Sequence, residues 1–332
     1  MKIPTRSCVV LVAAAGFSSA TCVAQPKPAA ADYPNRVVRI VLPQPAGGGT
    51  DTVARTIAAK LADAWGQQVI VDNRAGANGI IGAEAVAKSK PDGYTYLYGF
   101  TSMLTINPSV YKALPYDTLR DFTPVTQTVT NQMALVVNPY LPVKSVKELV
   151  ALARARPGEL LYGSFGVGNQ THLTTELFRL EAKLKLLHVP YKGETPAITE
   201  LVGGQVALMF SPSAGVAPFI NQGRLRLLAT AGDKRSPAFP DTPTMAESGF
   251  PGVISLGWGG LLAPAGTPPD MVQKLARETT RAVVAQDARE RLAALGAEPS
   301  PSNTPEAFGG WIASETEKWT RVVKGAGLYQ SQ

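Results

Sequence analysis

The chain has 332 residues, which is long enough for two ordinary domains with hydrophobic cores. Hydrophobic residues make up 45% of it and charged residues 17%, a globular composition that excludes a disordered or fibrous chain. The net charge is +7, but the lysines and arginines are scattered without long runs or interleaved aromatics, so we expect a solvated basic surface rather than one that binds nucleic acid or an anionic membrane.

Residues 1–24 have the features of a secretory signal peptide. Lys2 and Arg6 precede a run of small and apolar residues, 8–20, that is too short to span a bilayer. We expect cleavage after Ala24, with a later cut within residues 29–31 as the alternative. The chain is therefore predicted to be exported.

Both cysteines of the chain, Cys8 and Cys22, fall within this predicted signal. The mature protein would then contain no disulfide and no cysteine nucleophile. Lipidation of Cys22 is an alternative, although the preceding residues lack the usual leucine. Residues 25–34, rich in Pro and Ala, are predicted to form a tether before the fold.

Strands and helices alternate from residue 37 to residue 99, which predicts a parallel α/β sheet. Val53, Ile57 and Leu61 form an apolar stripe at helical spacing, and Gly66 ends that helix. The predicted strands are 37–42, 69–71 and 94–99, and the predicted helices are 50–65 and 80–88.

A Thr-rich extended segment at 122–129 is predicted to cross into a second lobe, where the alternation restarts. The strands expected there are 134–137, 160–163, 187–189, 206–210 and 225–230, and the helices are 145–156, 171–182, 196–202 and 214–222. Residues 257–262 are expected to cross back, and helices 268–285, 287–295 and 305–324 to pack on the first lobe. The predicted fold is a two-lobed α/β protein, with residues 35–125 and 257–332 in lobe 1 and residues 126–256 in lobe 2.

Three glycine-rich loops follow predicted strands, where ligands sit in open α/β sheets. They are residues 45–51, 75–79 and 163–171. Glycine lets backbone N–H groups point at a ligand from the start of a helix, and each helix dipole stabilises an anion there by roughly 0.3–1 kcal/mol. Two such loops on opposed lobes would form a clamp for a carboxylate. A single loop of this kind is more often a tight turn, but three with hydroxyl or amide residues at the helix starts favour a site.

The sequence lacks the complete motifs of common enzyme families. Residues 47–51 lack the Gly-Lys-Ser/Thr of a phosphate-binding loop, and residues 166–171 lack the third glycine of a dinucleotide fingerprint. The chain has two histidines, so a zinc site is not expected. A hydrolase using Ser164 and His172 is a remote alternative. Asp51 could bind an ammonium group or cap its own helix.

The sequence resembles the periplasmic substrate-binding proteins of tripartite tricarboxylate transporters, the Bug receptors. The similarity runs in order along the mature chain and rests on segments 45–51 (PAGGGTD), 73–82 (NRAGANGIIG), 91–95 (PDGYT), 163–168 (GSFGVG), 189–193 (VPYKG), 201–206 (LVGGQV), 223–229 (GRLRLLA) and 264–268 (PAGTP), with His172 and Leu173.

The resemblance implies a Venus-flytrap fold of the type II-like class, with two mainly parallel sheets flanked by helices and joined by two crossing strands. It implies a non-enzymatic periplasmic receptor without metal or cofactor, which is a monomer and delivers a small mono- or dicarboxylate to transporter membrane subunits. A sensor for a kinase using the same cleft is the alternative. The implied ligand-binding residues are Ala46, Gly47, Gly48, Gly49, Thr50, Asp51, Asn78, Gly79, Thr101, Ser102, Ser164, Gly166, Gly168, Asn169, Gln170, Thr171, Tyr191, Lys192, Gly193 and Ser211.

Two departures from the family pattern bear on the ligand. Ser211 stands where these receptors commonly have an aspartate, which argues against a ligand that carries an amine. Asn169 and Gln170 stand where serines are usual, and their longer side chains predict a smaller pocket.

Overall fold

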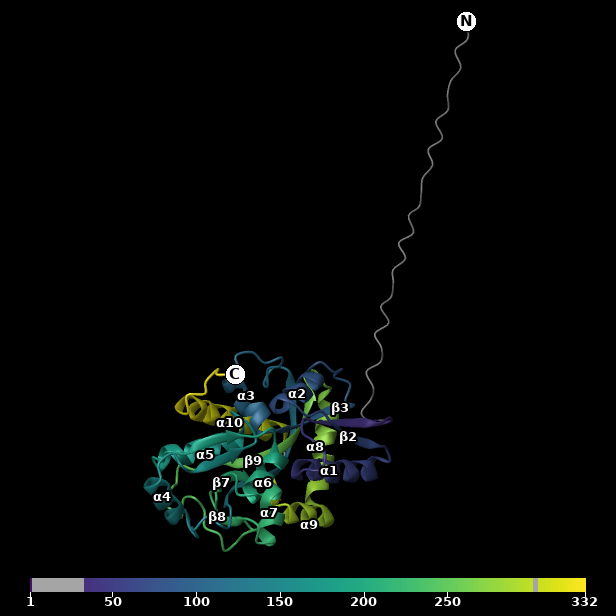
Figure 1. The fold of residues 1–332 in the computed structure, drawn as a ribbon. Coiled ribbons are helices and arrows are strands. Elements are labelled where there is room, and N and C mark those ends of the chain that lie inside the picture. Colours follow the sequence, from purple (N-terminus) through teal and green to yellow (C-terminus); the bar gives the residue numbers. More distant parts are fainter. Residues whose placement is uncertain (2–32, 301–303) are drawn as a thin grey trace. The chain divides into compact units, whose positions relative to one another are not determined.

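The computed structural model describes Met1, residues 33–300 and residues 304–332 (Figure 1). The features used below belong to one compact unit, Pro34–Gln332. The predicted signal peptide, its cleavage sites, both cysteines and most of the predicted tether lie outside the described residues.

The sheet of the first lobe is built on strand β1 (Val38–Leu42), which pairs in parallel with β2 (Val69–Asn73) on one side and β3 (Thr95–Phe100) on the other. Four of the five residues of β1 are buried, as expected for a parallel strand covered on both faces. Helices α1 (Gly49–Trp65) and α2 (Ile80–Ala87) form the crossovers. The predicted alternation in this part of the chain is therefore confirmed.

Strand β4 (Phe122–Val137) belongs to both lobes. Its first part pairs antiparallel with β9 (Leu256–Pro264) and β10 (Ala297–Pro299), while Met133–Val137 pair antiparallel with β7 (Leu208–Pro212). The sequence predicts separate strands at 122–129 and 134–137, and that division is wrong. The polar residues between them keep pairing with β9, so a single strand of 16 residues crosses the molecule.

The second lobe repeats the parallel arrangement around β5 (Leu161–Ser164), which lies between β6 (Leu187–Pro190) and β7. Strand β8 (Arg226–Thr230) pairs with β4. The helices here are α4 (Val146–Ala155), α5 (Gln170–Glu181), α6 (Glu194–Val202) and α7 (Ser213–Asn221). The two-lobed fold with crossing strands, in which parallel strands lie away from the crossing, is confirmed.

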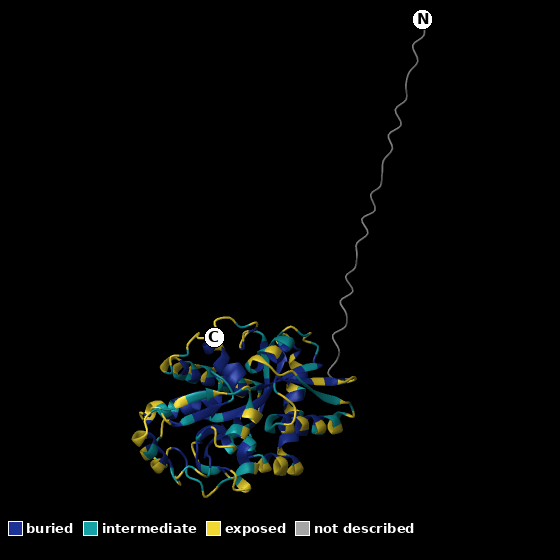
Figure 2. Cartoon of the chain, in the orientation of Figure 1, coloured by how far each residue is buried: buried dark blue, intermediate teal, exposed yellow. Residues whose placement is uncertain are grey.

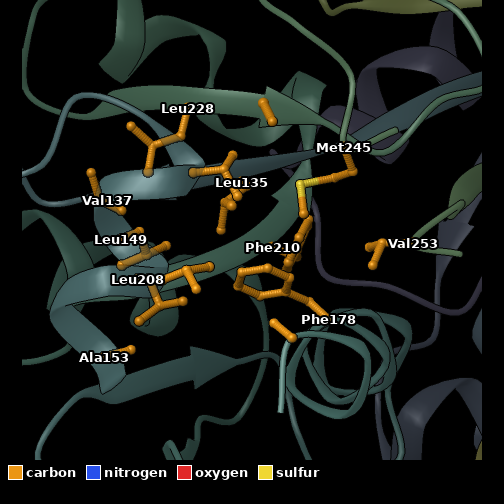
Figure 3. Packing of buried hydrophobic residues seen from close by; sticks show 14 of the residues in the cluster. Leu135, Val137, Leu149, Ala153, Phe178, Leu208, Phe210, Leu228, Met245 and Val253 are labelled. Atoms are coloured by element: carbon orange, nitrogen blue, oxygen red, sulfur yellow. The ribbon is translucent and has the colours of Figure 1, made fainter. Parts of the chain in front are cut away.

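The core of the second lobe forms where β4 and β7 meet helices α4 and α5. Figure 3 shows Leu135 of β4 in this cluster, with Phe210 of β7 and Phe178 of α5 nearby. The two phenylalanine rings pack edge to face, with centroids 6.0 Å apart. This packing fixes β7 and α5, whose ends carry predicted site residues.

The last three helices are α8 (Pro269–Val284), α9 (Gln286–Ala294) and α10 (Pro305–Gly325). They pack on elements of the first lobe, as predicted: α8 contacts α1, and Phe308 of α10 lies edge to face against Trp258 of β9. Figure 2 shows them buried on one side and exposed on the other. The sequence did not predict the short elements η2 (Ala77–Gly79), η3 (Ser102–Ile106), α3 (Asn107–Val110) and β10.

We expect Leu135→Ala to lower the free energy of unfolding by about 2–5 kcal/mol, because the side chain is fully buried and its removal leaves a cavity. Leu119→Ala is the matched control, since Leu119 is 64% exposed, and it should change stability by less than about 0.5 kcal/mol. Urea unfolding of both variants measures this. Equal decreases in the free energy of unfolding of the two variants would contradict the assignment of Leu135 to the core.

Candidate functional site

The loop after β1 leads into the start of α1, and its shape depends on two features. Gly47 adopts a φ of +88°, a left-handed conformation that favours glycine. Gly48 is the N-cap of α1, and among the described residues no side chain caps this helix. The first turn of α1 therefore keeps N–H donors directed out of the helix end.

Asp51 holds this loop in place from within the first turn of α1. One carboxylate oxygen accepts hydrogen bonds from the Gly47 N–H at 3.0 Å and from Arg55 Nε at 2.9 Å. The other accepts from Asn73 Nδ2 at 2.9 Å. Burial alone would raise the pKa of Asp51, but the hydrogen bonds from Arg55, Gly47 and Asn73 outweigh it and hold the pKa below the ordinary value of 3.8. This arrangement favours a role for Asp51 in holding the loop before α1 over binding of an ammonium group.

The first-lobe loop lies directly against two helix starts of the second lobe. A Cβ on Gly49 would lie 3.0 Å from the Cβ of Ala214 on α7, and a Cβ on Gly48 would lie 3.4 Å from Oε2 of Glu194 on α6. Figure 1 shows α1 close to α6 and α7. The absence of side chains in this loop is what permits such an approach. Helices α6 and α7, like α1, have no side-chain cap among the described residues.

The second glycine loop contains Ala77, Asn78 and Gly79, all three at positive φ. For Ala77 and Asn78 this conformation is strained and persists because the surroundings fix it. Asn78 Nδ2 donates to Asn107 Oδ1 at 2.7 Å, and Asn78 Oδ1 accepts from Asn169 Nδ2 at 3.1 Å. Asn169 is the N-cap of α5, so Asn78 joins the two lobes.

Most backbone N–H groups of the third glycine loop, after β5, donate hydrogen bonds to side chains of the protein. The N–H of Phe165 donates to Thr171 Oγ1, that of Gly166 to Ser164 Oγ, and that of Gly168 to His172 Nδ1. The N–H of Gln170 donates to Ser102 Oγ, and the N–H of Thr171 donates to Asn169 Oδ1. These donors, which the sequence predicts would face a ligand, are thus occupied by protein atoms in this conformation.

Ser164 and the two histidines form a packed cluster at the start of this loop. Ser164 is fully buried, and its hydroxyl oxygen lies 2.6 Å from His188 Nε2, so the Ser164–His172 pair of the hydrolase alternative is not formed. The imidazole rings of His172 and His188 stack with centroids 3.8 Å apart. Burial, followed by the neighbouring His172, lowers the pKa of His188 to about 4, and burial also lowers that of His172. Both rings are therefore neutral near pH 7.

Three of the remaining predicted residues are buried in the structure. Thr101 Oγ1 accepts from the Trp258 N–H, Ser102 meets Gln170 as described above, and Ser211 donates to the Pro212 carbonyl at 3.4 Å. The segment Tyr191–Gly193 leads into α6, with Tyr191 partly buried and Lys192 exposed. The surface hollows beside Arg36 and beside Tyr140 lie away from all these loops.

The structure thus brings Gly48 and Gly49 of the first lobe to the first residue of α6 and to the residues that follow β7, whereas a Cβ at Gly193 would meet no atom within 4 Å. It also reveals Glu194, Ala214 and Gly215 at this place, which sequence reasoning missed. Glu194 follows Gly193 directly at a helix start, and that signal was available, but nothing in the sequence shows that α6 and α7 face α1.

We expect Asp51→Asn to lower the free energy of unfolding by about 1.5–3 kcal/mol at pH 7, because a charged acceptor of three hydrogen bonds is lost. The folded pKa of Asp51 lies below its unfolded value, so its contribution is present above about pH 3.8 and is lost as the pH falls through the folded pKa.

Urea unfolding at several pH values measures this difference. Asp63→Asn is the matched control, since Asp63 is an exposed residue of the same helix. If the difference in the free energy of unfolding between wild type and Asp51→Asn stayed constant from pH 7 to pH 3, the proposed hydrogen-bond network would be contradicted.

No helix in the part of the chain that the structure describes has both the length and the apolar character needed to cross a membrane.

Comparison with known proteins identifies relatives over nearly the whole chain. BugT of Bordetella pertussis is 40% identical over 320 residues, which are 96% of this chain and 95% of BugT. The solved structure of R. palustris Rpa4515 with adipate is 38% identical, with a TM-score of 0.85, and the match covers 89% of this chain and 99% of that one. MatC from Rhodopseudomonas palustris with bound malate is 33% identical, with a TM-score of 0.81 over 88% of this chain and 100% of MatC.

Residues 53–328 match the family described as the tripartite tricarboxylate transporter family receptor. Together with the two lobes and their shared strand, this match shows that the chain belongs to that family of receptors.

Proposed function

We propose that this protein captures a small mono- or dicarboxylate between its two lobes, at the meeting point of α1, α6 and α7. The observation that carries the proposal is the approach of the bare loop at Gly48 and Gly49 to the starts of α6 and α7. Three helix N-termini without side-chain caps provide N–H donors and dipoles that favour an anion. No arginine clamp is needed for such a site.

The relatives support a carboxylate as the ligand class. The Rpa4515 structure contains adipate and the MatC structure contains malate, both dicarboxylates. The proposed binding set includes the predicted residues of the first-lobe loop, Ala46–Asp51, with Asp51 as the residue that positions the loop. The loop 164–171 and its contacts Asn78 and Ser102 would act by joining the lobes.

We further propose that the protein is exported to the periplasm as a monomer and delivers its ligand to the membrane subunits of a tripartite tricarboxylate transporter. Family membership and the predicted signal sequence support this assignment. Closure of the lobes over a ligand would give the membrane subunits a surface that differs from the open form.

A thermal-shift screen of the purified protein tests the ligand class. Adipate, malate, other C4–C6 dicarboxylates, citrate, aromatic acids and nicotinate form the panel. A ligand that binds the native state at a hundredfold excess over its dissociation constant adds about 2.7 kcal/mol of stability, so the melting temperature should rise. Lack of a shift with every acid would contradict the proposal.

Gly49→Val tests the place of binding. The added side chain would overlap with Ala214, so closure should cost about 1–3 kcal/mol, a loss of affinity of roughly 5- to 150-fold. Gly310→Val is the matched control, since a Cβ at Gly310 of α10 meets no atom within 4 Å. Calorimetric titration with the acid that gives the largest thermal shift measures the affinity of both variants. Wild-type affinity in Gly49→Val would remove this loop from the site.

A further inference from the structure

Glu194 places a carboxyl group among the three helix starts. It is the first residue of α6, and its Oε2 lies near Gly48 of α1. Its Oε1 lies against Gly215 of α7, where any side chain would overlap with it. An acid therefore occupies the position at which the proposed function expects the ligand's own carboxylate.

No cation neutralises this carboxyl group. Among the described residues no hydrogen bond or ion pair involves Glu194, which is partly buried, and burial is the only influence on its pKa. The charged group on α1 nearest to the loop is Asp51, whose carboxylate is already held by Arg55, Gly47 and Asn73. Helix α7 has no titratable side chain, and on the segment around α6 Lys192 is exposed and Glu200 is itself acidic.

Two carboxylates that meet at hydrogen-bond distance cannot both stay ionised. A ligand that reaches the uncapped starts of α1 and α7 would meet the Glu194 carboxyl group there. A shared proton converts this repulsion into a short charge-assisted hydrogen bond. The alternative is that Glu194 pairs with an ammonium group on the ligand.

We propose that Glu194 and a carboxylate of the ligand share one proton, so that the receptor binds its anion together with a proton. This inference rests on the proposed function. It makes Glu194 a specificity-determining residue that favours carboxylates over sulfonates, because a sulfonate remains ionised and shares a proton poorly. Burial already raises the pKa of Glu194 before any ligand arrives, and no opposing charge lowers it.

The sign of the pH dependence follows from this sharing. Binding requires Glu194 to be protonated, so the competent fraction falls tenfold for each pH unit above the pKa of the free receptor. The affinity for adipate or malate should therefore fall once the pH exceeds the pKa of Glu194 in the free receptor, by up to about tenfold per pH unit above it. Both acids are fully ionised above about pH 6.5.

Calorimetric titration of the whole protein with adipate and with malate tests the proposal. Titrations in two buffers of different ionisation enthalpy measure the protons taken up on binding. Proton uptake by wild type should rise toward one as the pH of the titration is raised above the pKa of Glu194 in the free receptor. Glu194→Gln, a neutral mimic of the protonated acid, should take up none and should bind equally well across this pH series, more tightly than wild type above that pKa. Glu200→Gln, on the same helix, is the matched control and should behave as wild type.

Three results would overturn the inference, and each is distinguishable. Binding by wild type without proton uptake, unchanged in Glu194→Gln, would refute proton sharing while leaving the proposed function intact. Loss of binding in Glu194→Gln at every pH, with normal folding by circular dichroism, would show that Glu194 must be charged. Failure of wild type to bind any carboxylate would contradict the proposed function as well.

Discussion

The shared strand β4 is the constraint on which the rest of the structure depends. Because its first part pairs with β9 and its last residues pair with β7, the sheets of the two lobes are extensions of the same backbone ladder. Strands β1, β6 and β7 each lead into a helix start, and those of α1, α6 and α7 meet near Gly48 and Gly49. This topology supports the proposed ligand site between the lobes, because ligands of open α/β sheets bind beyond the carboxyl ends of the strands.

The helix starts that follow the strands of the two lobes differ in whether a side chain caps them. Helix α5 is capped by Asn169, and the loop before it uses its N–H groups on Thr171, His172 and Ser164. Such a loop is stable without a ligand. Helices α1, α6 and α7 lack side-chain caps among the described residues, so an anion can supply the missing acceptors. The capped start of α5 joins the lobes, and the uncapped starts are the ones to which the proposed function assigns binding.

Much of this organisation could be predicted from the sequence. The β-branched run at β1, the apolar run at β7 and glycine loops before helices predict two parallel α/β lobes, and the structure and the family match confirm them. The continuity of β4 was missed because Thr130, Asn131 and Gln132 are polar and interrupt the apolar pattern, whereas backbone pairing with β9 continues through all three and overrides the weak strand preference of Asn131. Propensity describes single residues, whereas pairing depends on a distant strand.

The sequence predicted the candidate site less completely than the fold, and the reason is similar. Local pattern identifies a glycine loop as a candidate but does not show where its N–H groups point, and for residues 164–171 many point inward. Glu194 follows a glycine at a helix start, but the sequence does not show that Gly48 and Gly215 lie beside it, because both are distant in sequence. Ser211 is buried against its own strand end, so its effect on amine ligands stays a prediction.

The most direct test of the account is an experimental structure of the protein grown with adipate or malate. The account predicts ligand density between the lobes, with one carboxylate against the backbone of Gly48 and Gly49 and within hydrogen-bond distance of the Glu194 carboxyl group. Density located elsewhere, or lobes closed on a ligand that touches neither the first-lobe loop nor the start of α6, would contradict it.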